Sequence, residues 1–525
     1  MTAKLKTPGV YIKELNAFPN GVTQVETAVP AFVGYTPQAS LDGESYFNVP
    51  TKITSFAAFQ ALFCYPETPA PATPKKQYYP EYYLIKQQQE PDKGNYMKIA
   101  GNFYAILPDP NTIYYMYNSI RIFYENGGGA AYIVSVGTYG APSKKTMRLG
   151  DQMVNLNVRL NDLQNGVALL KKETEPTMYI CPDATLLSVA NNGALMQTML
   201  LQNSEMQTAI SIFDVIGGRN PDPLFYTDNI ENFRNNTGVQ GLSYGCAYYP
   251  FIGTTIMQQS DMDFTNLFGG DIKALESILL AASDANEKTS EILKIIQNPK
   301  DSDWTTAQLN TALLHASTTY SLIISQVLEE ANMLPPSGAM AGVITRTDNQ
   351  EGVWKAPANT SIVSVVSLPI KLSSEQQQGL NVDDVSGKSI NAIRVFNGIG
   401  ILIWGARTLD GNSDEWRYIA VRRTLIFLEQ SCKLATKGYV FEANNTNTWK
   451  AVKGMMNNFL ASMWRQGGLI GSRVEEAFFV KCGLNETMTS QEIVDGIIIV
   501  QVGVALLHPA EFIVFSFEQE MKIAN

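Results

Sequence analysis

The chain has 525 residues, a net charge of −10, 45% hydrophobic residues and 17% charged residues. This length exceeds what one hydrophobic core usually supports, so we expect about three domains. The acidic balance, without a concentrated basic surface, argues against a nucleic-acid partner.

Catalytic and metal-binding residue types are scarce. Two histidines, His315 and His508, are too few for a histidine-dependent triad or a multi-histidine metal site. The five cysteines lie far apart without a CxxC pair, which is typical of reduced thiols in a fold made in the cytosol. Neither a secretory signal nor a bilayer-spanning apolar run is visible, so we expect no direct membrane insertion. We therefore expect no catalytic residue, no cofactor and no metal.

The first elements in chain order are an arm, a strand and a loop. Residues 7–16 read TPGVYIKELN, in which Val10, Tyr11 and Ile12 favour an extended arm. Residues 28–36 predict a buried strand. Residues 66–80 form a proline-rich loop, because proline cannot donate to a strand ladder.

The middle of the chain predicts an α/β part. Residues 114–140 read as a helix, a glycine turn and a strand, and residues 177–217 read as a strand, a helix and a second, parallel strand. Asp183 follows the first strand of that unit, where α/β enzymes bind ligands, but a capping or turn aspartate is the favoured interpretation. Another strand is expected at 244–252. Residues 271–334, rich in Ala, Leu, Glu and Lys at helical spacing, predict an inserted helical hairpin.

The last third predicts two amphipathic helices and three strands. The helices lie near 416–437 and at 448–466, and the second carries one apolar side, made of Trp449, Val452, Met456, Phe459 and Met463. The strands lie at 474–482, 497–507 and 511–517. In the last of these, Phe512 and Val514 alternate with Ile513 and Phe515, so both faces should be covered.

Several stretches resemble the contractile tail-sheath family of phages and phage-like injection particles. They are residues 7–36, FYENGGGAAYIVSVG, PPSGAMAGVITRTDNQEGVWKAPAN, WGARTL and HPAEFIVFSF. The start of the chain is most similar to sheath subunits of the antifeeding-prophage type. Residues 66–100 and 271–334 depart from the family pattern.

The resemblance implies an α/β and α+β multidomain chain with the tail-sheath fold. Such a fold has a central α/β part, a helical insertion and a C-terminal domain built from both chain ends. We expect an N-terminal arm at 1–24 and a central domain at 25–140 and 335–407. An inserted α/β domain at 141–334 would contain the helical insertion 271–334, and residues 408–525 would form the C-terminal domain.

The same resemblance implies a structural subunit, not an enzyme. It would polymerise helically around an inner tube and shorten to drive the tube through a target envelope. The implied partners are further copies in stacked hexameric rings, the inner tube protein, and baseplate and terminal cap proteins. Assembly would take place in the bacterial cytoplasm, before the chain becomes part of a phage-tail-like particle or virion tail. A non-contractile structural or capsid-like protein and an α/β enzyme are the alternatives.

The family arrangement also implies where subunits meet. Terminal arms would pair with sheets of neighbouring subunits, through Val10, Tyr11 and Ile12 at one end and Phe512, Ile513, Val514 and Phe515 at the other. Lys450, Lys453 and Arg465 lie off the apolar side of the 448–466 helix and are expected to face an acidic tube. Ordinary solvated helix residues are the alternative interpretation. The insertion 271–334 is expected on the outer surface of the sheath.

Overall fold

The computed structural model describes residues 22–66, 75–91, 94–220, 226–298, 303–512 and 514. The chain forms two compact units. The larger one contains residues from Glu26 to Ile426 and from His508 onward, and the smaller one contains residues up to Val25 and from Phe427 to Leu507. No helix of the described residues is long and apolar enough to cross a membrane.

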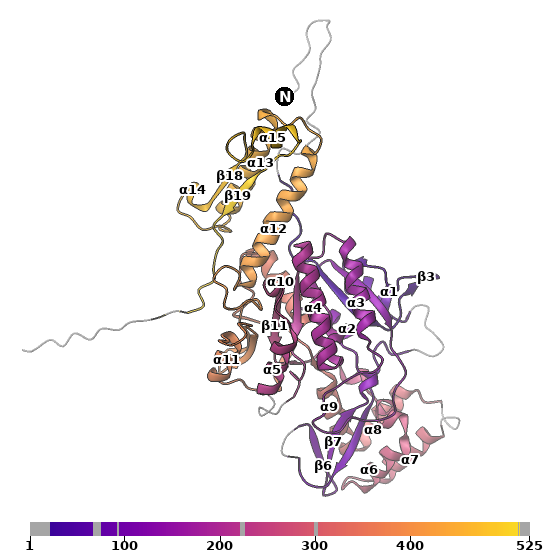
Figure 1. Ribbon diagram of the computed structural model, residues 1–525. Coiled ribbons are helices and arrows are strands. Elements are labelled where there is room, and N and C mark those ends of the chain that lie inside the picture. The colour runs from indigo at the N-terminus through magenta and orange to yellow at the C-terminus, as the bar shows by residue number, and fades with distance from the viewer. Residues whose placement is uncertain are drawn as a thin grey trace, which may run out of the picture. The chain divides into compact units, whose positions relative to one another are not determined.

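A nine-stranded sheet forms the centre of the larger unit (Figure 1). Its strands, in spatial order, are β14 (Thr360–Ser361), β17 (Gly400–Trp404), β16 (Asn391–Phe396), β11 (Gly245–Tyr249), β10 (Ile210–Asp214), β9 (Met178–Ile180), β1 (Pro30–Thr36), β8 (Ala131–Thr138) and β4 (Thr51–Ile53). The run from β16 to β8 is parallel, whereas β4, β17 and β14 pair antiparallel to their neighbours. The strands predicted at 28–36, 177–217 and 244–252 are confirmed, including the parallel pair.

Helices cover both faces of this sheet. On one face, Phe32 of β1 packs edge-on against Phe123 of α2 (Met116–Glu125), with the ring centroids 5.4 Å apart. The next side chain, Val33, points to the other face, where a Cβ on Gly166 of α3 (Leu160–Leu169) would lie 2.6 Å from it. Glycine at 166 therefore lets α3 approach the strands closely. Helix α10 (Ser337–Glu351) packs beside α2, and α4 (Val189–Met206) packs beside α3.

The structure joins segments that the sequence analysis assigns to different domains. Strands from residues 25–140, 141–334 and 335–407 all lie in this one sheet. The predicted domain limits place breaks at residues 140 and 407, whereas the compact larger unit runs across both. Sequence patterns indicate several of these strands, but they carry no information about which strands become neighbours.

Further elements of the larger unit surround this sheet. Short strands and helices occur as β2 (Ser40–Leu41), β3 (Glu44–Ser45), α1 (Phe56–Phe63), α5 (Tyr226–Asn236), β12 (Ile252–Thr254), β13 (Met333–Leu334), β15 (Val365–Ser367) and α11 (Ser374–Asn381). A separate antiparallel sheet has the order β5 (Tyr82–Gln87), β7 (Asn102–Pro108), β6 (Tyr96–Ile99).

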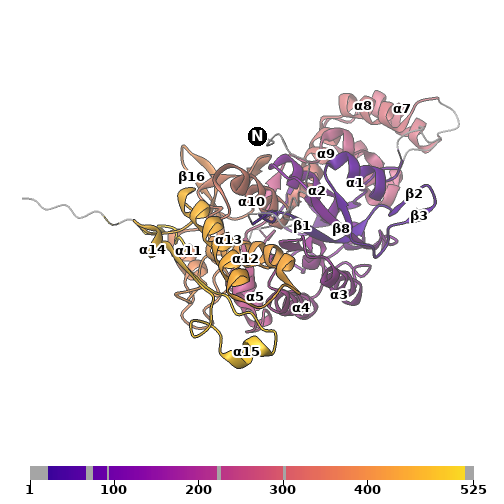
Figure 2. The same cartoon turned by 90° about the horizontal axis from the view of Figure 1, so that it is seen from above.

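Residues 271–334 form four helices rather than the predicted hairpin. They are α6 (Ile272–Ala281), α7 (Glu287–Gln297), α8 (Thr306–Ala316) and α9 (Thr318–Ala331). Figure 2 shows α7 and α8 at the periphery of this unit. Helix α9 is linked to the segment that follows β10, because Glu330 of α9 accepts a hydrogen bond from Arg219 at 2.6 Å. The hairpin prediction was wrong because several caps, such as Asn286 and Thr305, divide the helical pattern into short pieces.

The smaller unit is built around a helix and a two-stranded sheet. Its second chain segment starts within α12 (Ile419–Thr436). It continues with α13 (Thr446–Arg465), α14 (Val474–Ala477), β18 (Phe478–Lys481), α15 (Ser490–Val494) and β19 (Gln501–Val504). The predicted apolar side of α13 is confirmed, since Trp449, Val452, Met456, Phe459 and Met463 are all buried.

Only one of the two described chain ends belongs to the smaller unit. The backbone N–H of Val25 donates to the hydroxyl of Ser431 at 3.2 Å, which ties the N-terminal end to α12. The residues from His508 onward belong to the larger unit instead. The described part of the C-terminal segment therefore does not join the domain in which the sequence analysis places it.

Asp183 is a capping residue, as the favoured interpretation states. It is fully buried, and its carboxylate accepts backbone hydrogen bonds from Tyr35 at 3.0 Å, Tyr115 at 2.7 Å and Met116 at 3.3 Å. Burial raises the pKa of Asp183 to about 6, and the three hydrogen bonds oppose that rise. The carboxylate joins the start of α2 to the end of β1, and both would lose a partner without it.

Replacement of Asp183 should therefore destabilise the larger unit. Asp183→Asn places an amide NH2 against backbone donors and should lower the free energy of unfolding by about 2 kcal/mol. Asp183→Ala should lower the free energy of unfolding further. Urea unfolding of the monomeric subunit measures this difference. Asp303→Asn, at an exposed aspartate, is the matched control, and equal midpoints for the Asp183 and Asp303 variants would contradict the capping role.

Candidate functional site at the C-terminal segment

Hydrogen bonds to its backbone hold Arg407, the central residue of the site, in place. Arg407 follows β17, and Asn391 at the start of β16 binds it in both directions. The Arg407 N–H donates to Asn391 Oδ1 at 2.8 Å, and Asn391 Nδ2 donates to the Arg407 carbonyl at 2.8 Å. A Cβ on Gly405 would lie 2.7 Å from Asn391 Oδ1, so a glycine is required at this close approach. These contacts fix the arginine at the edge of the rigid sheet.

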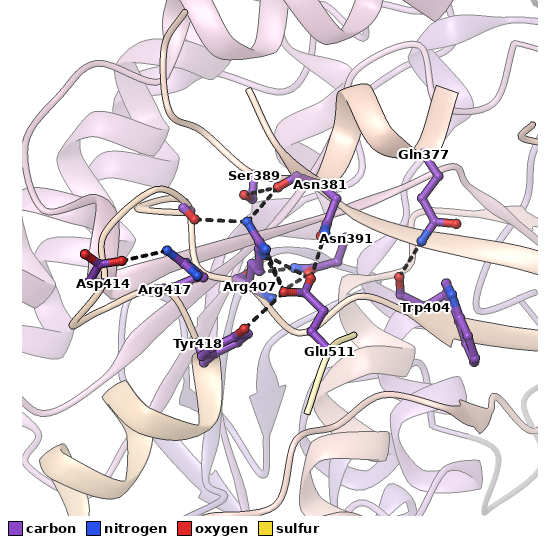
Figure 3. A network of polar contacts seen from close by, with 11 residues as sticks. Gln377, Asn381, Ser389, Asn391, Trp404, Arg407, Asp414, Arg417, Tyr418 and Glu511 are labelled. Carbon is purple, nitrogen blue, oxygen red and sulfur yellow. Dashed lines mark hydrogen bonds and ion pairs between the residues drawn. The ribbon is translucent and has the colours of Figure 1, made fainter. Parts of the chain in front are cut away.

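The guanidinium of Arg407 meets the carboxylate of Glu511, 104 residues further along the chain (Figure 3). Its Nε lies 3.0 and 3.2 Å from the two carboxylate oxygens, and its Nη2 lies 2.6 Å from Oε2. Asn381 Nδ2 donates to Oε1 at 2.7 Å, and the Tyr418 hydroxyl donates to Oε2 at 3.0 Å. Glu511 thus accepts hydrogen bonds from three side chains of the larger unit.

This ion pair is largely removed from water. The side chain of Arg407 is 3% exposed and that of Glu511 is 20% exposed. Arg407 Nη1 also donates to the carbonyls of Asn381 at 3.2 Å and Gly411 at 3.1 Å. Loss of one partner of a buried pair leaves an uncompensated charge, which typically costs about 3–5 kcal/mol. The C-terminal segment is therefore firmly attached at Glu511.

The pKa of Glu511 reflects the same contacts. Burial alone would raise the pKa of this carboxyl, but the hydrogen bonds from Arg407 and Asn381 and the charge of Arg407 outweigh burial and lower it. The pKa of Tyr418 is raised by burial and by the neighbouring Glu511. Glu511 is therefore ionised at neutral pH, and the tyrosine remains a hydrogen-bond donor.

Directly beyond this attachment, the chain exposes apolar side chains. Phe512 is 71% exposed and Val514 is 85% exposed. Residues 511, 512 and 514 lie in no strand, so the strand expected at 511–517 does not form there. Its backbone groups and apolar side chains would need a second strand and a covering surface. Ile513, Phe515, Val10, Tyr11 and Ile12 lie outside the described residues.

The smaller unit contains a two-stranded sheet whose outer edges are unpaired among the described residues. Strands β18 and β19 pair antiparallel, and no third strand joins them within the described part of the chain. Phe479 is 45% exposed and Val502 is 38% exposed. A Cβ on Gly503 would lie 2.2 Å from the ring of Phe479, so the ring covers the glycine opposite it. A two-stranded sheet is marginal alone, and its outer edges can accept further strands.

The three predicted tube-facing cations differ in their surroundings. Lys450 and Arg465 are exposed on α13. Lys453 is half-buried, and its ammonium lies 3.2 Å from Glu486 in an ion pair within the smaller unit. Lys453 is therefore the least available of the three for a contact with another protein.

The α/β enzyme alternative finds little chemical support in the described residues. A cavity of about 680 Å³ lies at the carboxyl end of β10, but no histidine or cysteine lines it. Its one arginine, Arg219, is paired with Glu330. Within the described ranges, no cluster of three or more His, Cys, Asp or Glu side chains could hold a metal ion.

Sequence reasoning missed the Arg407–Glu511 pair. Arg407 lies inside the stretch WGARTL, and Glu511 is the single charged residue in the segment AEFIVFSF. A carboxylate at the start of a strongly apolar segment needs a partner if it is buried, so Glu511 could have been singled out. Nothing in the spacing indicates which cation it meets.

Comparison with known proteins agrees with this architecture. Residues 412–520 match the family model described as the phage tail sheath C-terminal domain. The tail sheath protein of Enterobacteria phage T4 is 27% identical over 141 residues, which cover 27% of this chain and 21% of that protein. The matched segment thus spans only a small part of that longer relative.

Two solved structures match nearly the whole chain. The helical sheath of the anti-feeding prophage in its contracted state is 25% identical, with a TM-score of 0.57 over 98% of this chain and 100% of that chain. The contracted sheath complex of PVC, an extracellular contractile injection system, is 24% identical, with a TM-score of 0.58 over 99% of both chains. By sequence at its C-terminal end and by fold over nearly its whole length, the chain is similar to contractile tail-sheath proteins.

Proposed function

We propose that the chain is the structural subunit of a contractile sheath, which polymerises helically around an inner tube and shortens to drive the tube through a target envelope. The observation that carries the proposal is the C-terminal segment, which is fixed at Glu511 and then exposes Phe512 and Val514. Such a segment can bury these side chains on another copy. The similarity of the whole chain to sheath structures solved in the contracted state supports the contractile role.

The proposed contact is the addition of a strand to the sheet of a neighbouring copy. The segment beyond Glu511 would pair with an outer edge of the β18–β19 sheet, where Phe479 and Val502 are partly exposed. About four main-chain hydrogen bonds, each worth about 1 kcal/mol net, give a link of a few kcal/mol before side-chain burial is added. The arm and the receiving edge are different surfaces, so the contact is heterologous and generates an open helix.

The remaining partners follow from the same proposal. The copies would form stacked hexameric rings around the inner tube protein, closed by baseplate and terminal cap proteins. Similarity to a chain in the solved structure of the anti-feeding prophage baseplate supports an association with a baseplate. The particle would be assembled in the bacterial cytoplasm. Helices α7 and α8, at the periphery of the larger unit, would lie on the outer surface of the sheath.

Removal of the exposed apolar groups of the arm should prevent polymerisation. The double variant Phe512→Ser and Val514→Ser keeps Glu511 and its ion pair with Arg407, so the subunit should fold normally and form at least tenfold less tubular polymer. Electron microscopy and sedimentation measure the polymer. Val385→Ser removes an equally exposed valine elsewhere in the larger unit and serves as the matched control. Polymers of normal number and length from the double variant would contradict the arm contact.

The N-terminal arm should be needed in the same way. Deletion of residues 1–15 removes Val10, Tyr11 and Ile12 and should leave a folded monomer that assembles poorly, because one of the two strand-addition contacts is lost. Circular dichroism reports the fold, and electron microscopy reports assembly. Normal tubular particles from the truncated chain would show that the arm is dispensable.

The tube-facing role of α13 requires a test that spares the pair between Lys453 and Glu486. The variant Lys450→Glu and Arg465→Glu reverses the two exposed cations, and each exposed charge contact is worth only about 0.5 kcal/mol. Because every subunit repeats these contacts along the tube, we expect short, tube-free or prematurely contracted sheaths. Lys172→Glu, at an exposed lysine of the larger unit, is the control. Full-length extended particles in normal number would exclude a tube-facing role for these cations.

A further inference from the structure

The C-terminal segment changes unit between two consecutive residues. Leu507 is the last residue of the smaller unit, and from His508 the chain belongs to the larger one. The ring of His508 packs edge-on against Tyr418, with the ring centroids 5.8 Å apart. Three residues later, Glu511 enters the buried ion pair with Arg407. The arm that starts at Phe512 is thus attached to the larger unit although it follows β19 of the smaller unit in sequence.

The pocket that receives Glu511 is held together by contacts that do not involve Glu511. Asn391 binds the backbone of Arg407 from both sides, and the carbonyls of Asn381 and Gly411 orient its guanidinium. The Nε and Nη2 groups then point at the carboxylate, together with Asn381 Nδ2 and the Tyr418 hydroxyl. Every group directed at the two oxygens is a donor, so the pocket is selective for a carboxylate over an amide.

We propose that the Arg407 pocket and Glu511 form an anchor that holds the C-terminal arm against tension. The anchor transfers any pull on the arm to the nine-stranded sheet of the larger unit, through Asn391 on β16. The two-stranded β18–β19 sheet, which in the proposed sheath receives the arm of another copy, then does not also carry the pull on the arm of its own chain. This inference rests on the proposed sheath function, in which arms connect moving subunits. Glu511 and Arg407 act as positioning residues, because they fix the arm without touching the neighbouring copy.

The variant Glu511→Gln tests the anchor with little change in shape. Its amide NH2 meets the donors of Arg407, Asn381 or Tyr418, so the segment should leave the pocket. We expect amide hydrogen exchange at residues 508–512 to accelerate at least tenfold, while exchange in β1 and β8 stays as in the unaltered chain. Sheaths of the variant should form in lower number and should fragment when contraction is triggered with urea.

Two further variants make the readout specific. Glu175→Gln removes the carboxylate of an exposed ion pair with Lys52, which lies at 2.6 Å, and should behave as the unaltered chain in every assay. Tyr418→Phe removes one donor to Glu511 and keeps the ring beside His508, so it should give an intermediate acceleration of exchange. If Glu511→Gln does not fold, the Tyr418→Phe variant decides the question by the same two measurements.

The outcomes separate the anchor from the sheath function. Failure of the unaltered chain to form contractile polymers would overturn the proposed function itself. Intact contraction of Glu511→Gln sheaths, or unchanged exchange at residues 508–512 in both anchor variants, would overturn the anchor alone. Faster exchange together with fragmentation only in the anchor variants supports it.

Discussion

The arrangement at the C-terminal segment depends on one constraint, which is that the guanidinium of Arg407 is buried and needs a counter-charge. Asn391 and two backbone carbonyls hold this group in place at the end of the sheet. Glu511 supplies the negative charge and thereby determines where the packed part of the segment ends. Phe512 and Val514, which follow this pair, have exposed side chains. In the proposed sheath, the ion pair separates the part of the chain that folds within the subunit from the exposed Phe512 and Val514, which would contact another copy.

Much of the larger unit could be predicted from local sequence patterns. The strand at 28–36, the helix and strand at 114–140 and the parallel pair at 177–217 carry strong periodicity and clear glycine turns, and all of them form. The apolar side of α13 is equally clear, because its apolar residues recur at spacings of three and four. These features are local, so neighbouring residues suffice to indicate them. A capping or turn role was also the favoured interpretation of Asp183, but its backbone partners Tyr35, Tyr115 and Met116 lie far away in the sequence and could not be named.

Features that depend on distant residues could not be predicted in this way. The order of the nine strands brings together three segments that the sequence analysis places in two domains, and no periodicity encodes that order. Arg407 and Glu511 meet across 104 residues, and the pair of Lys453 with Glu486 is equally invisible in the sequence. The apolar segment at 511–517 looks like a strand, yet its described residues 511, 512 and 514 lie in no strand, because a strand also needs a partner that propensity does not supply. Local propensity indicates that these segments are apolar and strand-forming. It gives no information about which distant residues or surfaces they contact.

The exposure of Phe512 and Val514 has a consequence for how the protein behaves at different concentrations. A segment that buries its apolar groups only on another copy gains free energy in proportion to the logarithm of subunit concentration. With the proposed arm contact, dilute subunits would keep Phe512 and Val514 in water, and polymer would form above a threshold concentration. Below that threshold the same side chains are available to any apolar surface, which is an aggregation hazard. Rapid synthesis near a nucleating template would shorten the time that each copy spends in that state.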